Sequence, residues 1–116
     1  MQLSSVYYES NIAEVPNNTW WIDSRATTHI TNSIQRYLTT REPKESERFI
    51  LMGNRLKAEV VVVGTYRLIL ETAHQMDLME TFYVPSISKN LISGSRLDYT
   101  GYSVLFGYKK LSLMSN

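Results

Sequence analysis

A single carboxylate, Asp23, stands where an apolar run ends and small polar residues begin. Apolar residues 20–22 precede it, and Ser24 and Arg25 follow it. An ionised carboxylate at the border of a hydrophobic core needs a partner or a chemical task, since burying it uncompensated costs several kcal/mol. Two interpretations are open: a turn aspartate that closes an ordinary strand, or half of a carboxylate pair that exchanges a proton during hydrolysis.

Other residues that do chemistry are scarce in this chain. Asp77 and Asp98 lack the setting of an apolar strand followed by a small residue, so we interpret them as surface acids. The sequence has no cysteine and two distant histidines, too few for a usual metal site. We therefore expect no metal and no cofactor, and we interpret His29 as a structural loop histidine.

Composition limits the remaining functions. The 116 residues fit one domain, and 12 Lys and Arg against 11 Asp and Glu leave a net charge of +1. A nearly neutral chain gives no electrostatic reason to expect a nucleic-acid or membrane partner. No apolar run approaches the roughly 18 residues of a membrane span, and the start lacks the basic region of a secretory signal. A cytoplasmic location is expected.

Aromatic pairs leave nucleic-acid binding open as an alternative function. Residues 7–8 and 20–21 are aromatic, and Lys109 and Lys110 are a basic pair, as in a small β-barrel that stacks bases. Because the charge is so low, we interpret the aromatic pairs as core or interface instead.

Short β-branched segments separated by turn signals predict an all-β domain. Seven or eight strands are expected, chiefly over residues 20–23, 49–52, 56–63, 66–71, 76–84, 102–106 and 109–114. One short helix is predicted over 88–97, capped by Ser88 or Asn90. Residues 1–19 are predicted to be an N-terminal arm or edge strand, and 20–116 the domain proper.

Glycines mark the expected turns. Gly53 and Asn54 are predicted to form the tight turn of a hairpin, because both tolerate positive φ. Gly64 and Thr65 interrupt a β-branched run and predict a bulge. The charged segment 41–48 is expected to be a solvated loop without function.

Several motifs occur together in a fixed order. They are Asp23-Ser24-x-Ala26-Thr27-Thr28-His29, then residues 52–55, 63–68, 82–91 and 97–106. Together, over about residues 20–114, the chain resembles the protease region of plant copia-type retrotransposon Gag-Pol polyproteins. The resemblance implies a retropepsin-like closed β-barrel with one short helix, an aspartic endopeptidase that works as a homodimer on a peptide or polyprotein substrate.

The dimer follows from the chemistry of that family. Hydrolysis needs two nearby carboxylates that share one proton, one acting on a water and the other on the carbonyl oxygen. This chain has one such motif. The second Asp23 must then come from a twin subunit through a symmetric contact.

The resemblance also gives roles to neighbouring residues. Ser24 is expected to brace the two active-site loops across the axis, although a plain turn serine would look the same. Substrate contacts are expected from Arg25, Ala26, Thr27 and Thr28, and from Met52, Gly53 and Asn54 near the tip of a flap hairpin over 49–60. The two threonines are equally consistent with local turn bonding. Residues 90–92 are expected to support the active-site loop.

Arg25 departs from the family pattern, which has glycine at this position. A guanidinium beside a carboxylate favours the ionised form and so opposes a shared proton. We therefore expect Arg25 to impair peptide cleavage while leaving the fold and dimer possible. The alternative is a catalytically inactive, domesticated dimer that acts as a peptide-binding or protein-binding module.

Overall fold

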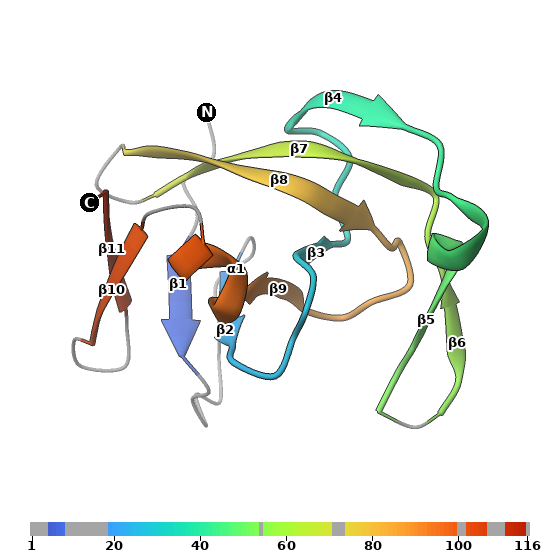
Figure 1. Ribbon diagram of the computed structural model, residues 1–116, viewed down its shortest axis with the longest axis horizontal. Helices are drawn as coiled ribbons and strands as arrows, with labels where there is room; N and C mark the ends of the chain where they lie inside the picture. The colour runs from blue at the N-terminus through green and yellow to red at the C-terminus, as the bar shows by residue number, and fades with distance from the viewer. Residues whose placement is uncertain are drawn as a thin grey trace.

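The structure, a computed structural model, describes residues 5–8, 19–53, 55–70, 74–99, 102–106 and 111–115, with side chains described only within 19–97. Its elements, in chain order, are β1 Ser5–Tyr8, β2 Thr19–Asp23, β3 Ile30–Thr31, β4 Tyr37–Arg41, the 3-10 turn η1 Glu45–Glu47, β5 Phe49–Leu51, β6 Lys57–Glu59, β7 Val62–Ile69, β8 Gln75–Tyr83, β9 Asn90–Ser93, α1 Gly94–Tyr99, β10 Tyr102–Phe106 and β11 Leu111–Ser115 (Figure 1).

The predicted all-β fold with one short helix is confirmed. Seven strands form a mixed sheet in the order β1-β2-β9-β3-β8-β7-β4, and the hairpins β5–β6 and β10–β11 are two separate two-stranded sheets (Figure 1). The described residues hold eleven strands, more than predicted, because pieces as short as β3 lack a readable sequence period. Closure of a barrel and dimerisation stay predictions, as does the division at residue 19.

The order of three strands determines where the Asp23 loop lies. Strand β9 lies between β2 and β3, parallel to β2 and antiparallel to β3. The chain leaves β2 at Asp23 and enters β3 at Ile30, so the connecting loop must cross the carboxyl end of β9. Residues just before α1 therefore lie directly against the loop.

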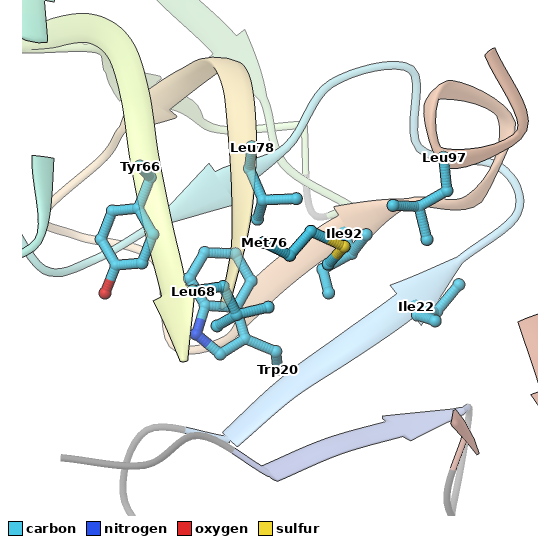
Figure 2. Close-up of a cluster of buried hydrophobic side chains, with 8 residues drawn as sticks. All are labelled: Trp20, Ile22, Tyr66, Leu68, Met76, Leu78, Ile92 and Leu97. Carbon is cyan, nitrogen blue, oxygen red and sulfur yellow. The ribbon is translucent and has the colours of Figure 1, made fainter. Parts of the chain in front are cut away.

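The main core explains why β2 is held firmly. Alternate residues of the strand, Trp20 and Ile22, are 1% and 4% exposed, and both point into a cluster with β7, β8, β9 and α1 (Figure 2). The other members are Tyr66, Leu68, Met76, Leu78, Ile92 and Leu97. Trp20 also stacks at a tilt on Tyr66, with ring centroids 5.1 Å apart. Burial of Ile22 thus fixes the position of the next residue, Asp23, which is the last of β2.

A second cluster supports the hairpin β5–β6. Its buried residues are Ile30, Ala58, Val60, Val63, Val84 and Ile87, with Ile50, Met52, Phe82 and Leu91 packed against them. The cluster joins the hairpin to β3, β7, β8 and β9, although the hairpin has no strand pairing with the main sheet. Hydrophobic contact, and not sheet pairing, holds the hairpin in place.

The helix predicted over 88–97 is wrong in its first half. Residues 90–93 form the buried strand β9, and the helix begins at Gly94. The side chain of Asn90 favours a strand here over a helix. It accepts hydrogen bonds from Thr31 Oγ1 and the Asn32 N–H and donates one to the Thr19 carbonyl. These partners belong to segments far away in sequence, so local propensity could not predict them.

The strand predicted over 56–63 is divided into two. Strand β6 ends at Glu59 and β7 begins at Val62, because the chain turns from the hairpin into the main sheet. The hairpin turn lies where it was predicted, because the Arg55 N–H donates to the Met52 carbonyl at 2.9 Å, but the positive φ, of 67°, is at Arg55. Asn54, predicted at the tip, lies outside the described residues.

The bulge predicted at Gly64 is confirmed. The β7–β8 register shifts between Gly64 and Tyr66. A Cβ at Gly64 would overlap the Thr39 carbonyl oxygen of β4, so only glycine fits there. Strands β7 and β8 pair antiparallel, and so do β10 and β11. The connecting residues 71–73 and 107–110 lie outside the described residues.

Candidate functional site

Asp23 is the last residue of β2 and is paired in register with Ser93 of β9. Its carboxylate accepts a hydrogen bond from the Arg25 N–H, with Oδ1 2.8 Å from the nitrogen, and its carbonyl accepts one from the Ala26 N–H at 3.3 Å. Asp23 therefore forms the tight turn expected of a turn aspartate. Both interpretations of Asp23 are compatible with this bond, because the turn uses Oδ1 and does not involve Oδ2.

A pocket of about 510 Å³ lies against this loop. Its lining comes from the loop, from the hairpin β5–β6 and from the apolar second cluster: Asp23, Arg25, Ala26, Thr27, Thr28, Ile30, Ile50, Leu51, Met52, Gly53, Ile87 and Leu91. The carboxylate thus lies in the same hollow as the hairpin predicted to act as a flap.

Ser93 of β9 anchors the Asp23 loop through two hydrogen bonds. Its hydroxyl, which is fully buried, donates to the Ala26 carbonyl at 2.7 Å, and its N–H donates to Nδ1 of His29 at 2.9 Å. His29 in turn accepts a hydrogen bond on its carbonyl from the Phe82 N–H. The middle of the loop is therefore tied to β9, and its end is tied to both β8 and β9.

His29 is a structural residue, as expected from the sequence. It is 2% exposed, and burial, followed by the positive charge of Arg96, lowers its pKa to about 4. A ring that accepts a hydrogen bond on Nδ1 is neutral with its proton on Nε2. His29 positions the loop and is not among the residues that line the pocket.

Arg25 extends from the loop at the pocket. Its side chain is exposed and contributes to the lining. Its guanidinium has no hydrogen bond or ion pair with any part of the chain that the structure describes, whereas Arg41, Arg48 and Arg67 are all paired with acids. The guanidinium is therefore available to whatever enters the pocket.

The segment 41–48 has a structural task that the sequence did not suggest. Arg41 at the end of β4 binds Glu47 through both carboxylate oxygens, at 2.8 and 3.0 Å, and Glu80 of β8 at 2.6 Å. The hydrogen bonds from Arg41 and from the Lys44 N–H lower the pKa of Glu47 to about 2. This cluster ties the base of the hairpin β5–β6 to the main sheet.

Most residues predicted for the site lie together in this pocket. Asp23, Arg25, Ala26, Thr27, Thr28, Met52 and Gly53 line it. Ser24 is exposed beside the lining, and Asn54 lies outside the described residues. Sequence reasoning placed Ile50 and Leu51 in the flap hairpin and Leu91 in the segment that supports the loop, without assigning them to the site. It missed Ser93, Ile30 and Ile87. The Ser93-Gly94 pair after an apolar run was the available signal for the first of these.

Other candidates have structural explanations. Asp77 is exposed and paired with Arg67 across β7 and β8, with Nε and Oδ1 3.0 Å apart. Trp20 and Trp21 are buried, which removes them as a base-stacking surface. Among the described residues no three His, Asp or Glu side chains gather as a metal site, and no described helix is long and apolar enough to cross a membrane. Asp98 lies where side chains are not described.

A protein-family comparison decides the lineage of the domain. The family described as Pol polyprotein, beta-barrel domain, matches residues 20–102, well over half of the chain. The chain belongs to this family. The segment that matches the Pol polyprotein β-barrel domain contains every residue of the pocket lining, so the pocket is a feature of a retroelement Pol polyprotein domain. Comparison with curated proteins and with solved structures gives no match.

Proposed function

We propose that this Pol polyprotein β-barrel domain is a retropepsin-like aspartic endopeptidase of a copia-type, plant retrotransposon, acting as a cytoplasmic homodimer on polyprotein peptides. The order of motifs along residues 20–114 supports the copia type. The observation that carries the activity is the place of Asp23: it ends a core-anchored strand and lines a pocket together with a hairpin.

The hairpin β5–β6 has the surface of an element that closes over a peptide. Phe49, Leu51 and Leu56 are 53%, 70% and 65% exposed, large apolar side chains concentrated on one short hairpin. Such exposure usually means that a ligand or partner covers the surface in the working state. The polar edges of a hairpin also suit an extended peptide, which pairs by main-chain hydrogen bonds.

The reaction needs a second carboxylate. In a dimer, one Asp23 takes a proton from water while the other gives a proton to the carbonyl oxygen of the scissile peptide bond. Two carboxylates this close cannot both stay ionised without cost, so they share one proton. Asp23 is the one acid among the described residues that line the pocket, which supports a partner subunit as the source of the other.

Arg25 is expected to weaken this chemistry. Its guanidinium lies at the same pocket as the carboxylate, and a dimer would bring two of them to one cleft. Positive charge favours the ionised carboxylates and opposes the shared proton. The second candidate function follows from the same observation: a dimer that binds peptide without cleaving it.

Three variants separate these functions. We expect Arg25→Gly to cleave a denatured protein substrate at least about tenfold faster than the wild type between about pH 4 and 7, because removing the guanidinium restores the shared proton. Asp23→Asn in the Arg25→Gly background should abolish cleavage. Retained peptide binding with no cleavage by any variant supports the binding module. Equal, robust cleavage with and without Arg25 would show that Arg25 is harmless, and cleavage that survives Asp23→Asn would refute the proposal.

A further inference from the structure

We propose that Arg25 makes the Asp23 pocket selective for peptides that carry an acidic side chain among apolar neighbours. The inference rests on the proposed function in taking the pocket as a peptide cleft, and its charge argument also takes the dimer from there. It applies equally to a cleaving enzyme and to a binding module, because it concerns what the pocket recognises.

The first support is the freedom of the guanidinium. The turn at Asp23 is closed by the backbone N–H of Arg25, with 2.8 Å between nitrogen and Oδ1, so the side chain is not needed to hold the carboxylate. Arg67, by contrast, forms a bidentate pair with Asp77, at 3.0 and 3.2 Å. None of the five donors of the Arg25 guanidinium is used by the described residues, and their planar fork fits a carboxylate.

The second support is the pocket around it. Apart from Asp23 and Arg25, the described lining carries no ionisable side chain. Ile30, Ile50 and Leu91 give it apolar walls that reduce access of water to a bound ligand. A charge-assisted bond formed against such walls is stronger than the same bond in open water.

The third support is the charge of the complete cleft. A carboxylate pair with one shared proton carries a single negative charge, and the two Arg25 side chains of a dimer add two positive ones. The cleft is then positive, or neutral if both carboxylates are ionised, whereas the same two states without Arg25 carry one or two negative charges. An acidic side chain is therefore attracted to this cleft when the pair keeps its shared proton, and in either state it is repelled less than from a cleft with glycine at this position.

The same chemistry favours a peptide over a nucleic acid. A phosphate chain needs several cations along its path, and the described lining has a single arginine beside a carboxylate. The net charge of the whole chain is only +1. Apolar walls suit side chains of a peptide, and one guanidinium suits one carboxylate.

A peptide-selection experiment tests the inference. The full chain, carrying Asp23→Asn to prevent turnover, is mixed with capped octapeptides of apolar residues in which one position is Glu, Gln or Lys, and the bound fraction is measured by mass spectrometry. We expect Glu peptides to bind about tenfold more tightly than their Gln twins at the preferred position. Arg25→Gln should remove this preference, and Arg25→Glu should turn it toward Lys. Arg25 is exposed on a loop, and matching melting curves will show that the variants fold.

Each outcome bears on the inference separately from the proposed function. A Glu preference that persists in Arg25→Gln, or equal binding of Glu, Gln and Lys peptides, overturns it even if the Arg25→Gly enzyme cleaves well. Arg25-dependent binding of an oligothymidine instead of the peptides also overturns it. A Glu preference that follows the charge at position 25 supports it even if no variant cleaves, in which case the enzyme proposal alone fails.

Discussion

His29 shows how one side chain holds the candidate active-site loop. Its side chain is buried and accepts a hydrogen bond from the Ser93 N–H on Nδ1. Burial and the charge of Arg96 lower its pKa to about 4. The neutral ring fits this site, whereas a protonated ring would lose the acceptor and add a buried charge. Loop geometry therefore depends on His29 staying neutral, in a domain whose proposed chemistry belongs to mildly acidic solution.

The lowered pKa predicts a loss of stability in acid. An unfolded chain binds the His29 proton near the ordinary pKa of 6.5, and the folded chain binds it only near 4. As the pH falls between these values the unfolded state gains protons first, so the free energy of unfolding should fall by up to about 3 kcal/mol. Urea unfolding from pH 7 to 4 should show this fall in the wild type and a much smaller one in His29→Gln.

A matched variant controls this measurement. His74, the other histidine, is exposed, so His74→Gln shows how much of the change comes from replacing a histidine outside the loop. Protonation of carboxylates such as Glu47, whose pKa is lowered, also reduces the free energy of unfolding in acid, but by the same amount in all three proteins. Parallel curves for the wild type and His29→Gln would contradict the structural role given to His29.

At the scale of elements, the contact between β4 and β7 depends on Gly64. Its Cα lies so close to the Thr39 carbonyl that any Cβ would collide with backbone atoms, which cannot move away as a flexible side chain can. Gly64→Ala should therefore lower the free energy of unfolding by about 2–3 kcal/mol, an overpacking cost. Gly53→Ala is the control: nothing lies within 4 Å of its Cβ position, so a change within about 0.5 kcal/mol is expected. Thermal or urea unfolding measures both, and similar losses in the two variants would show that the close approach does not matter.

Elements with a local signal could be predicted from the sequence. The apolar run before Asp23, the β-branched run around Val62 and the bulge at Gly64 all predict strands or breaks that the structure contains. Strand β9 could not be recognised, because its identity depends on Asn90 binding Thr31 and Thr19 across the sheet. The positive φ at Arg55 was missed as well, since glycine and asparagine beside it are the residues that usually take that conformation.

The pocket could be predicted only in part, for the same reason. Residues of the loop and the hairpin are recognisable by their motifs, so Asp23 and Gly53 were expected to meet. Its floor, by contrast, comes from Ile30, Ile87 and Leu91, ordinary apolar residues that no local pattern distinguishes from core. Ser93, which ties the loop down, is a lone serine whose value depends on β9 lying between β2 and β3.

At the scale of the whole molecule, the proposed peptidase activity requires two chains. A single Asp23 can bind a water or a peptide, but it cannot act as acid and base together. Stable protein dimers bury roughly 1,200–2,000 Å² of surface, which a domain of this size can supply. Family membership and fold are established without the dimer, whereas the proposed peptidase activity would depend on it.

The mass of the particle in solution is therefore the most direct test of the central claim. Sedimentation equilibrium of the full chain, over protein concentrations from micromolar to near millimolar, should give the mass of two chains at the upper end and a reversible decline toward one chain on dilution. A mass of one chain at every concentration, with and without a bound peptide, would contradict the account, because Asp23 would then have no twin.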